Sequence, residues 1–181
     1  MGRLSARPKR RRPAHATPAT GPIGCAVLTV SDTRGEGSDP GGDLLCRLLE
    51  RAGHRIVTRV WARDEIRAIR AALRQGLAHA DADVVLATGG TGIAPRDRTL
   101  EAGAPLIERW LPGFGELFRQ RSLDQVGTAA WLSRAAAGVA RRRLVVFLPG
   151  SPRAVELALS EVLLPELSHA VGLLERRSHG E

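Results

Sequence analysis

Four short apolar runs, separated by longer segments of helical pattern, constrain the fold of this chain more than any other feature. Each run is rich in β-branched or aliphatic residues and is bounded by turn-forming residues, as expected of buried strands. The runs span 23–30, 55–61, 83–88 and 143–148. The last two show no alternation of polar and apolar residues, which is typical of central parallel strands covered by helices on both faces.

The segments between these runs are predicted to be helical. Apolar residues recur at helical spacing in 43–52 and 64–80. A third helix is predicted over 154–174, because Ser151 and Pro152 supply an N-cap residue and a proline at the first helical position. The segment 99–138 is longer, and its pattern predicts several short helices between the third and fourth strands. Alternating strands and helices predict an α/β fold with a three-layer, Rossmann-like, mostly parallel sheet and helices on both faces.

Length and charge divide the chain into one domain with two tails. The 181 residues correspond to a single domain of ordinary size. Of the net charge of +8, the first 20 residues carry +6 and no acid, so that the remainder carries +2. We therefore expect a disordered basic tail over 1–20, a domain over 21–176 and a short tail over 177–181.

Neither the cysteines nor the apolar segments indicate an oxidising compartment or a membrane. Cys25 lies in an apolar run and Cys46 in a helical pattern, and neither has metal-type spacing, so both are expected to be buried thiols. No continuous apolar run approaches the roughly 18 residues that a membrane-spanning helix needs. The basic start is followed by no apolar core of the kind found in signal peptides. A cytoplasmic protein without membrane partners is the expectation.

A polar segment follows each of the four predicted strands, and three of these segments are glycine-rich. They are 31–42, 63–65, 88–97 and 149–152. In an open α/β sheet, ligands bind at the carboxyl ends of the strands, and these ends lie along one edge. The sequence therefore predicts that the four segments converge on one binding site.

Two of the glycine-containing segments have the composition of phosphate-binding loops. Glycines in 88–92 allow the backbone to turn sharply, and successive free N–H groups form a concavity suited to anions. The segment is neither a P-loop nor a dinucleotide fingerprint, and a plain strand-to-helix turn is the alternative. Residues 149–151 lead into a helix N-terminus, where anion binding and simple capping by Ser151 are both compatible with the pattern.

Four aspartates lie in these polar segments, and three of them have both a functional and a structural interpretation. Asp97 has the chemistry to hold Mg²⁺ against a substrate phosphate, or it serves as a turn residue paired with a neighbouring arginine. Asp64 follows a strand and is either functional or the N-cap of the next helix. Asp39 precedes a proline, which predicts an N-cap and places a helix N-terminus beside the expected ligand.

In its motifs, the chain resembles the MoaB/Mog family of molybdenum-cofactor biosynthesis proteins, over about residues 24–174. The order and spacing of the motifs are specific, and the pattern is closer to MoaB than to MogA. The matching segments are LTVSDTRG (28–35), TGGTG with Asp97 (88–97), PGFGELFR (112–119), SRAAAGV (133–139) and PGSPRA (149–154).

The resemblance implies a molybdopterin-binding fold and an activity. In active members, Mg-ATP adenylylates molybdopterin, giving adenylyl-molybdopterin and pyrophosphate. The family's functional aspartates match Asp64 and Asp97, with Mg²⁺ expected at Asp97. The resemblance also implies a homotrimer or homohexamer and contact with other proteins of the pathway. The positions implied for substrate and phosphate binding are Ser31, Asp32, Asp39, Gly41, Gly42, Thr88, Gly89, Gly90, Thr91, Gly92, Pro149, Gly150 and Ser151.

Two departures and two alternatives remain. The 39–42 loop lacks the small hydroxyl residue that relatives often carry before its final glycine, and Arg153 stands where lysine is common. A non-catalytic oligomer that only binds molybdopterin is one alternative. The other is nonspecific nucleic-acid association through the basic tail, although a run of like charges is usually only a solvated segment, so no specific nucleic-acid partner is expected.

Overall fold

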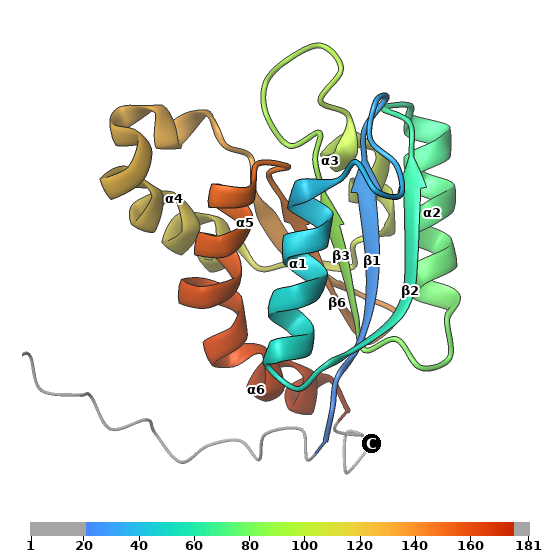
Figure 1. Cartoon of the computed structure of the whole chain (residues 1–181). Helices are drawn as coiled ribbons and strands as arrows, with labels where there is room; N and C mark the ends of the chain where they lie inside the picture. Colours follow the sequence, from blue (N-terminus) through green and yellow to red (C-terminus); the bar gives the residue numbers. More distant parts are fainter. Residues whose placement is uncertain (1–20, 176–181) are drawn as a thin grey trace, which may run out of the picture.

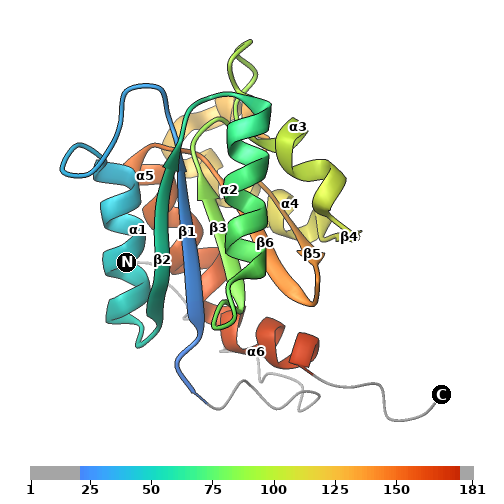
Figure 2. The ribbon, with the colours of Figure 1, turned by 90° about the vertical axis from the view of Figure 1, so that its right-hand side faces the viewer.

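A six-stranded sheet forms the centre of the protein in the computed structural model, which describes residues 21–175. The predicted tails lie outside the described residues. The strand order is β2-β1-β3-β6-β5-β4; Figure 1 labels the first four strands of this order, and Figure 2 labels all six. The first four of these strands are parallel to one another and match the four predicted runs. They are β1 (Gly24–Val30), β2 (Arg55–Ala62), β3 (Val84–Thr88) and β6 (Arg143–Leu148).

The segment predicted as several short helices also contains two strands, which is a correction to the sequence analysis. β5 (Ala136–Ala140) pairs antiparallel with β6, and the two-residue β4 (Arg109–Trp110) pairs antiparallel with β5. Neither strand has a strong local signal, because β5 is mostly alanine and glycine and β4 is very short. Pairing with the edge of the sheet overrides these weak propensities. The sheet is therefore mixed rather than parallel throughout.

The helices pack on both faces of the sheet, as predicted. Residues of α1, α4, α5 and α6 form one core cluster with alternate strand residues such as Val27 and Leu86. Residues of α2 and α3 form the other cluster with the intervening strand residues, such as Leu28 and Val85. In Figure 2, α2 lies on the near face of the sheet and α5 lies behind it. The bounds are α1 (Pro40–Arg51), α2 (Ile66–Ala78), α3 (Thr99–Gly103), α4 (Pro112–Val126), α5 (Pro152–Leu157) and α6 (Leu164–Glu175), with the short helices η1 (Ala104–Leu106), η2 (Gly127–Leu132) and η3 (Ala158–Leu163).

Capping determines where the helices beside the site begin. Asp39 accepts a hydrogen bond from the backbone N–H of Gly42 and caps α1, so this helix starts three residues before the predicted segment. Ser151 caps α5 in the same way through the N–H of Ala154. Asp64 does not cap α2, because the N-cap position is taken by Glu65, whose side chain makes no capping hydrogen bond. The side chain of Asp64 is therefore left for another role.

The stretch Pro152–Leu174 is continuous in helical structure, because α5, η3 and α6 follow one another directly. Its length and apolar composition would suffice for crossing a membrane. In this protein, however, Val155, Leu159 and Leu167 are fully buried against the sheet. These contacts are those of a core helix.

Candidate functional site

The four polar segments meet at the carboxyl ends of the parallel strands, where they enclose a polar cavity of about 430 Å³. In Figure 1 the loops after β1 and β3 both lie at the upper end of the molecule. β1 has β2 on one side and β3 on the other, which makes this the point where the chain changes direction across the sheet. The site residues predicted from sequence that line this cavity are Ser31, Asp32, Asp64, Gly89, Gly90, Asp97, Gly150 and Ser151.

Glycine is required where the loop after β3 turns across the end of β1. Gly89 has φ +101°, and a Cβ atom at this position would lie 2.3 Å from the carbonyl oxygen of Val30. Gly90 has φ +63°, and its Cβ atom would lie 2.4 Å from Oγ1 of Thr99. The hydroxyl of Thr99 in turn donates to the carbonyl oxygen of Gly89. The backbone path of this loop is therefore fixed before any ligand arrives.

Part of this loop has the N–H groups that an anion needs. The N–H of Gly89 donates to the carbonyl oxygen of Leu148 and is thus already used. The next three N–H groups, of Gly90, Thr91 and Gly92, have no acceptor within residues 21–175. Successive free N–H groups in such a turn bind anions. The donors available to a phosphate are therefore those of 90–92.

Three carboxylates contribute negative charge to the polar cavity. Burial raises the pKa of Asp64 above its ordinary value, and the charges of Asp32 and Asp97 add to this effect. Oδ2 of Asp97 accepts a 2.7 Å hydrogen bond from the N–H of Ala94, so Asp97 is a turn residue; the pairing with a neighbouring arginine that the sequence analysis considered is not seen, because Arg96 pairs with Asp32. Oδ1 of Asp97 accepts no hydrogen bond from any described residue. Asp97 therefore stabilises its turn through Oδ2, while Oδ1 remains available to a ligand or a metal ion.

Arg134 holds the loop that carries Asp97, and the sequence analysis did not single out this residue. Its Nε donates to the carbonyl oxygen of Gly92 at 2.7 Å, and its Nη2 donates to the carbonyl oxygen of Asp97 at 2.8 Å. Glu101 orients the guanidinium through an ion pair of 2.5 Å, which also lowers the pKa of Glu101. The only sequence signal was its place in the segment SRAAAGV.

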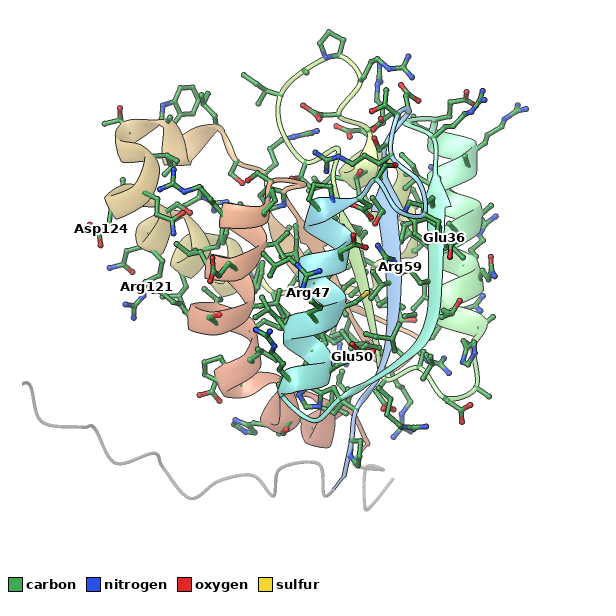
Figure 3. The ribbon with its side chains drawn as sticks, in the orientation of Figure 1. Glu36, Arg47, Glu50, Arg59, Arg121 and Asp124 are labelled. Carbon is green, nitrogen blue, oxygen red and sulfur yellow. The ribbon has the colours of Figure 1, made fainter. Side chains whose placement is uncertain are left out.

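The structure does not place Asp39, Gly41, Gly42 or Thr88 on the wall of the polar cavity. The side chain of Asp39 is fully buried and is surrounded by donors. Burial alone would raise its pKa, but hydrogen bonds from Thr29, Gly42, Arg59 and Trp61 lower it below the ordinary value. The positions of these donors are set by β1, α1 and β2, and Arg59 extends from β2 towards α1 (Figure 3).

Gly41, Gly42 and Thr88 lie behind the residues that line the polar cavity. A Cβ atom at Gly41 would lie 2.5 Å from the carbonyl oxygen of Gly150, so the start of α1 packs directly on the loop after β6. A Cβ atom at Gly42 would lie 2.1 Å from Oδ2 of Asp39. The hydroxyl of Thr88 donates to the carbonyl oxygen of Pro149 at 2.9 Å. The close packing of Gly41 and the hydrogen bond of Thr88 position the loop after β6, while the space at Gly42 is taken by the carboxylate of Asp39.

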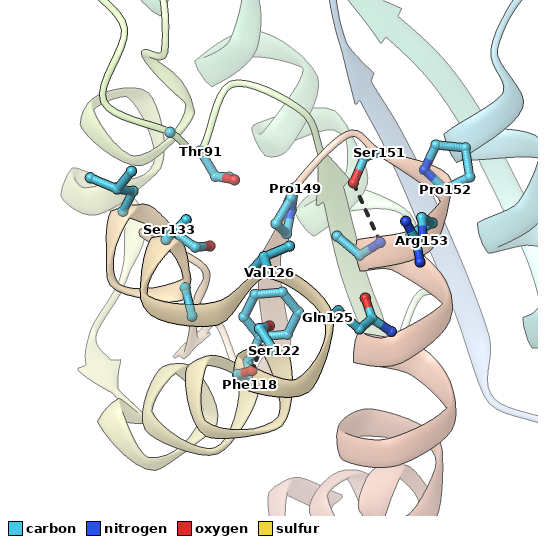
Figure 4. A pocket seen from close by; sticks show the side chains of 15 residues that line it. Thr91, Phe118, Ser122, Gln125, Val126, Ser133, Pro149, Ser151, Pro152 and Arg153 are labelled. Carbon is cyan, nitrogen blue, oxygen red and sulfur yellow. Dashed lines mark hydrogen bonds between the residues drawn. The ribbon is translucent and has the colours of Figure 1, made fainter.

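A second, mainly apolar cavity of about 460 Å³ adjoins the polar one, and Ser151 lines both. Thr91, Gly92 and Pro149, which were predicted to bind phosphate, line this second cavity. In Figure 4 the side chains of Ser122, Gln125 and Val126 from α4 face Pro149 and Arg153 across it. A mainly apolar wall and a polar wall thus meet at Ser151.

A magnesium ion fits this site only together with a phosphate ligand. Within residues 21–175, no group of three or more His, Cys, Asp or Glu side chains is placed to hold a metal ion. Mg²⁺ is commonly bound by one or two carboxylates together with substrate phosphates and water. Asp97, with one free carboxylate oxygen, and Asp64, beside it on the cavity wall, match that requirement.

The cysteines take no part in the site. Both thiols are free and buried, as predicted. Burial, with the nearby charge of Asp83, raises the pKa of Cys25 to about 12, and burial also raises the pKa of Cys46. Because the thiolate is the reactive form, neither side chain is a nucleophile at neutral pH.

Comparison with known proteins places this geometry among proteins of one pathway. The sequence pattern of the family described as "Probable molybdopterin binding domain" matches residues 26–169. Molybdenum cofactor biosynthesis protein B of Bacillus cereus is 43% identical over 164 residues, which cover 90% of this chain and 97% of the relative. The protein of the same name from Bacillus subtilis strain 168 is 44% identical over 158 residues, covering 87% and 93%.

The fold is also found among solved structures. A crystal structure of Molybdenum cofactor biosynthesis protein B superimposes with a TM-score of 0.85 at 43% sequence identity. The match covers 88% of this chain and 99% of that chain. The α/β fold predicted from the sequence, and its similarity to MoaB, are thus confirmed.

Proposed function

The chain belongs to the MoaB/Mog family of molybdenum-cofactor biosynthesis proteins, and on this basis we propose that it transfers the adenylyl group of Mg-ATP to molybdopterin. The observation that carries the proposal is that Asp64 and Asp97 line the same cavity as the loops 89–90 and 150–151. The free N–H of Gly90 lies on the wall of this cavity, and those of Thr91 and Gly92 follow on the wall of the adjoining apolar cavity. Acidic groups for a metal-bound nucleotide and amide donors for phosphates therefore lie next to one another.

The proposed reaction needs positioning and charge neutralisation rather than a protein nucleophile. An oxygen of the terminal phosphate of molybdopterin forms a bond to the α-phosphorus of ATP. The bond from this phosphorus to the oxygen that bridges to the β-phosphate breaks, and pyrophosphate leaves. The free N–H groups of 90–92 bind the phosphate charge that develops during the transfer.

The aspartates have separate roles in this proposal. Asp97 holds Mg²⁺ through its free oxygen, and the ion would neutralise phosphate charge when bound. Asp64, whose pKa is raised by burial, would be the second carboxylate beside that ion, and the charge of the ion would favour its ionised form. The apolar cavity beside Ser151 takes the planar part of a substrate, since pockets of this composition hold ring systems.

A molybdopterin-binding protein without turnover is the second candidate, because the fold and both cavities serve binding alone. The experiment that separates the two mixes purified protein with molybdopterin and Mg-ATP and follows pyrophosphate release. Release that requires molybdopterin supports adenylyl transfer. Molybdopterin binding without release assigns the protein to the binding class.

The remaining expectations are part of the same proposal. We place the protein in the cytoplasm as a homotrimer or homohexamer that works with other proteins of molybdenum-cofactor biosynthesis. Sedimentation of the full chain tests the oligomeric state. Nonspecific nucleic-acid binding through residues 1–20 is tested by removing them and measuring duplex binding as a function of salt.

A further inference from the structure

Arg96 and Asp32 form an ion pair across the mouth of the polar cavity. Asp32 lies on the loop after β1 and Arg96 on the loop after β3, and both line the cavity. The pair is open to solvent, since the two side chains are 66% and 34% exposed, respectively. It is therefore the contact that a ligand meets on its way in.

The backbone around Arg96 is anchored, whereas its side chain is held only by this pair. On one side Nε of Arg98 donates to the carbonyl oxygen of Pro95, and on the other Nη2 of Arg134 donates to the carbonyl oxygen of Asp97. Within the described part of the chain, Asp32 is the one hydrogen-bond and ion-pair partner of the Arg96 guanidinium, and the charge of Asp64 attracts the same guanidinium. The side chain can thus change partner without any change in the loop.

Asp32 stays in place when Arg96 leaves. Its Oδ1 accepts a hydrogen bond of 3.2 Å from the N–H of Asp64, while Arg96 uses the other oxygen. The second arginine on the cavity wall, Arg34, is tied to the carbonyl oxygen of Gly150 at 2.9 Å. Arg96 is therefore the cavity-lining guanidinium that is most available to an incoming anion.

Arg96 gains more by binding a polyphosphate than it loses by leaving Asp32. An exposed ion pair such as Arg96–Asp32 contributes only about 0–1 kcal/mol. A phosphate offers several charged oxygens, and guanidinium binds them in a bidentate manner. Three carboxylates lie on the same wall, so the approaching anion also needs a mobile cation to offset their charge.

We propose that Arg96 is a phosphate-binding residue that Asp32 holds at the mouth of the cavity until the polyphosphate of a nucleotide displaces it. The inference rests on the proposed function, in which the polar cavity takes the phosphates of ATP. It adds a residue for recognising the polyphosphate and a contact that is exchanged when the ligand binds.

The test is calorimetric binding of inorganic pyrophosphate to the full chain and to three variants, Arg96→Gln, Asp32→Asn and the double variant. Loss of the guanidinium is expected to weaken binding about tenfold or more, as for a lost hydrogen bond to a charged group. Asp32→Asn frees Arg96 and is expected to tighten binding about threefold. In the Arg96→Gln background the same change removes only the repulsion between Asp32 and pyrophosphate, and it is expected to tighten binding clearly less.

Each contrary outcome overturns the inference. Equal binding by the wild type and Arg96→Gln means that Arg96 does not contact phosphate. Equal tightening by Asp32→Asn in both backgrounds means that Asp32 acts by general repulsion and not by holding Arg96. Arg67→Gln is the charge-matched control, since Arg67 is exposed on α2 and lies outside the polar cavity, and thermal unfolding checks that every variant folds.

Failure of this inference is distinguishable from failure of the proposed function. Pyrophosphate binding needs no turnover. The predicted differences in affinity between the wild type and the three variants can therefore be observed even if the protein releases no pyrophosphate from ATP and molybdopterin. Conversely, active adenylyl transfer with unchanged pyrophosphate affinity in Arg96→Gln would leave the function in place and remove Arg96 from it.

Discussion

Arg134 donates a hydrogen bond of 2.8 Å from Nη2 to the carbonyl oxygen of Asp97 while its Nε holds the carbonyl oxygen of Gly92. One guanidinium thereby spans the loop that carries a predicted catalytic aspartate. The contact is to the backbone, so it fixes where Asp97 lies and not what its carboxylate does. Arg134 is therefore a positioning residue in our account.

We predict that Arg134→Gln and Arg134→Lys both reduce adenylyl transfer by tenfold or more while the protein stays folded. A lysine cannot donate to two carbonyl oxygens and a carboxylate in the planar arrangement of a guanidinium. Amide hydrogen exchange of 92–98 should accelerate in both variants. Glu101→Gln, which keeps the guanidinium, is the control and should have a smaller effect. Unchanged amide hydrogen exchange of 92–98 in Arg134→Gln would show that Arg134 does not hold this loop in place.

A second prediction compares two glycines with positive φ. Gly89→Ala meets both backbone strain and the carbonyl oxygen of Val30, whereas Gly53 has φ +85° and open space around it. The strain alone costs about 1–2 kcal/mol, which we expect for Gly53→Ala. Gly89→Ala should cost at least about 3 kcal/mol, because the loop must shift as well. If both variants lose the same free energy of unfolding in urea denaturation, the close approach of Gly89 to β1 does not contribute to the cost of the substitution.

Asp64 is predicted to lower stability in the ligand-free protein. Its pKa is raised in the folded state by burial and the charge of Asp32, so the folded state holds the proton more tightly than the unfolded state does. Ionised Asp64 therefore destabilises the fold at neutral pH, and this penalty disappears below the ordinary pKa of 3.8. Asp64→Asn should raise the Tm at pH 7, give no gain below pH 3.8 and abolish turnover. A lower Tm at pH 7 would show that the carboxylate is structural.

The ionised side chain of Asp39 has the opposite effect on stability to that of Asp64: it stabilises the folded state. Hydrogen bonds from Thr29 and other donors outweigh burial and lower its pKa in the folded state, so its stabilising effect is complete above the ordinary value of 3.8. It is lost as the pH falls from 3.8 through the lower folded pKa. We expect Asp39→Asn to cost about 2 kcal/mol at pH 7, as for hydrogen bonds to a charged group, and to flatten the acid limb of the stability curve. The control is Glu50→Gln, on the exposed side of α1 (Figure 3); a similar loss there would contradict a special role of Asp39.

Much of the fold could be predicted because local pattern and tertiary structure agree in its centre. The four parallel strands are continuous apolar runs, and their loops necessarily converge once the strands are parallel. The antiparallel β5 could not be predicted in the same way, because Ala136, Ala137 and Gly138 favour no strand by themselves. Its pairing with β6 depends on contacts between distant parts of the chain.

In the candidate site, too, residues with a local sequence signal could be predicted, whereas those placed by contacts with distant residues could not. Residue type and position left the roles of Asp64 and Asp97 open, and the motif match to the MoaB/Mog family was needed to propose them as functional. The inward turn of Asp39, at the start of α1, depends on Arg59 and Trp61, which lie on β2. Arg134 reaches its loop from 37 residues away in the sequence. Such long-range hydrogen bonds have no local signal, and only the folded chain shows them.

The most direct test of the account measures adenylyl-molybdopterin by chromatography after the wild type and Asp97→Asn are loaded equally with molybdopterin and given Mg-ATP. An asparagine oxygen can still accept the N–H of Ala94, so the turn is expected to survive. The account predicts product with the wild type and none with Asp97→Asn at equal molybdopterin binding. Equal product from both proteins, or bound molybdopterin without product in the wild type, would contradict it.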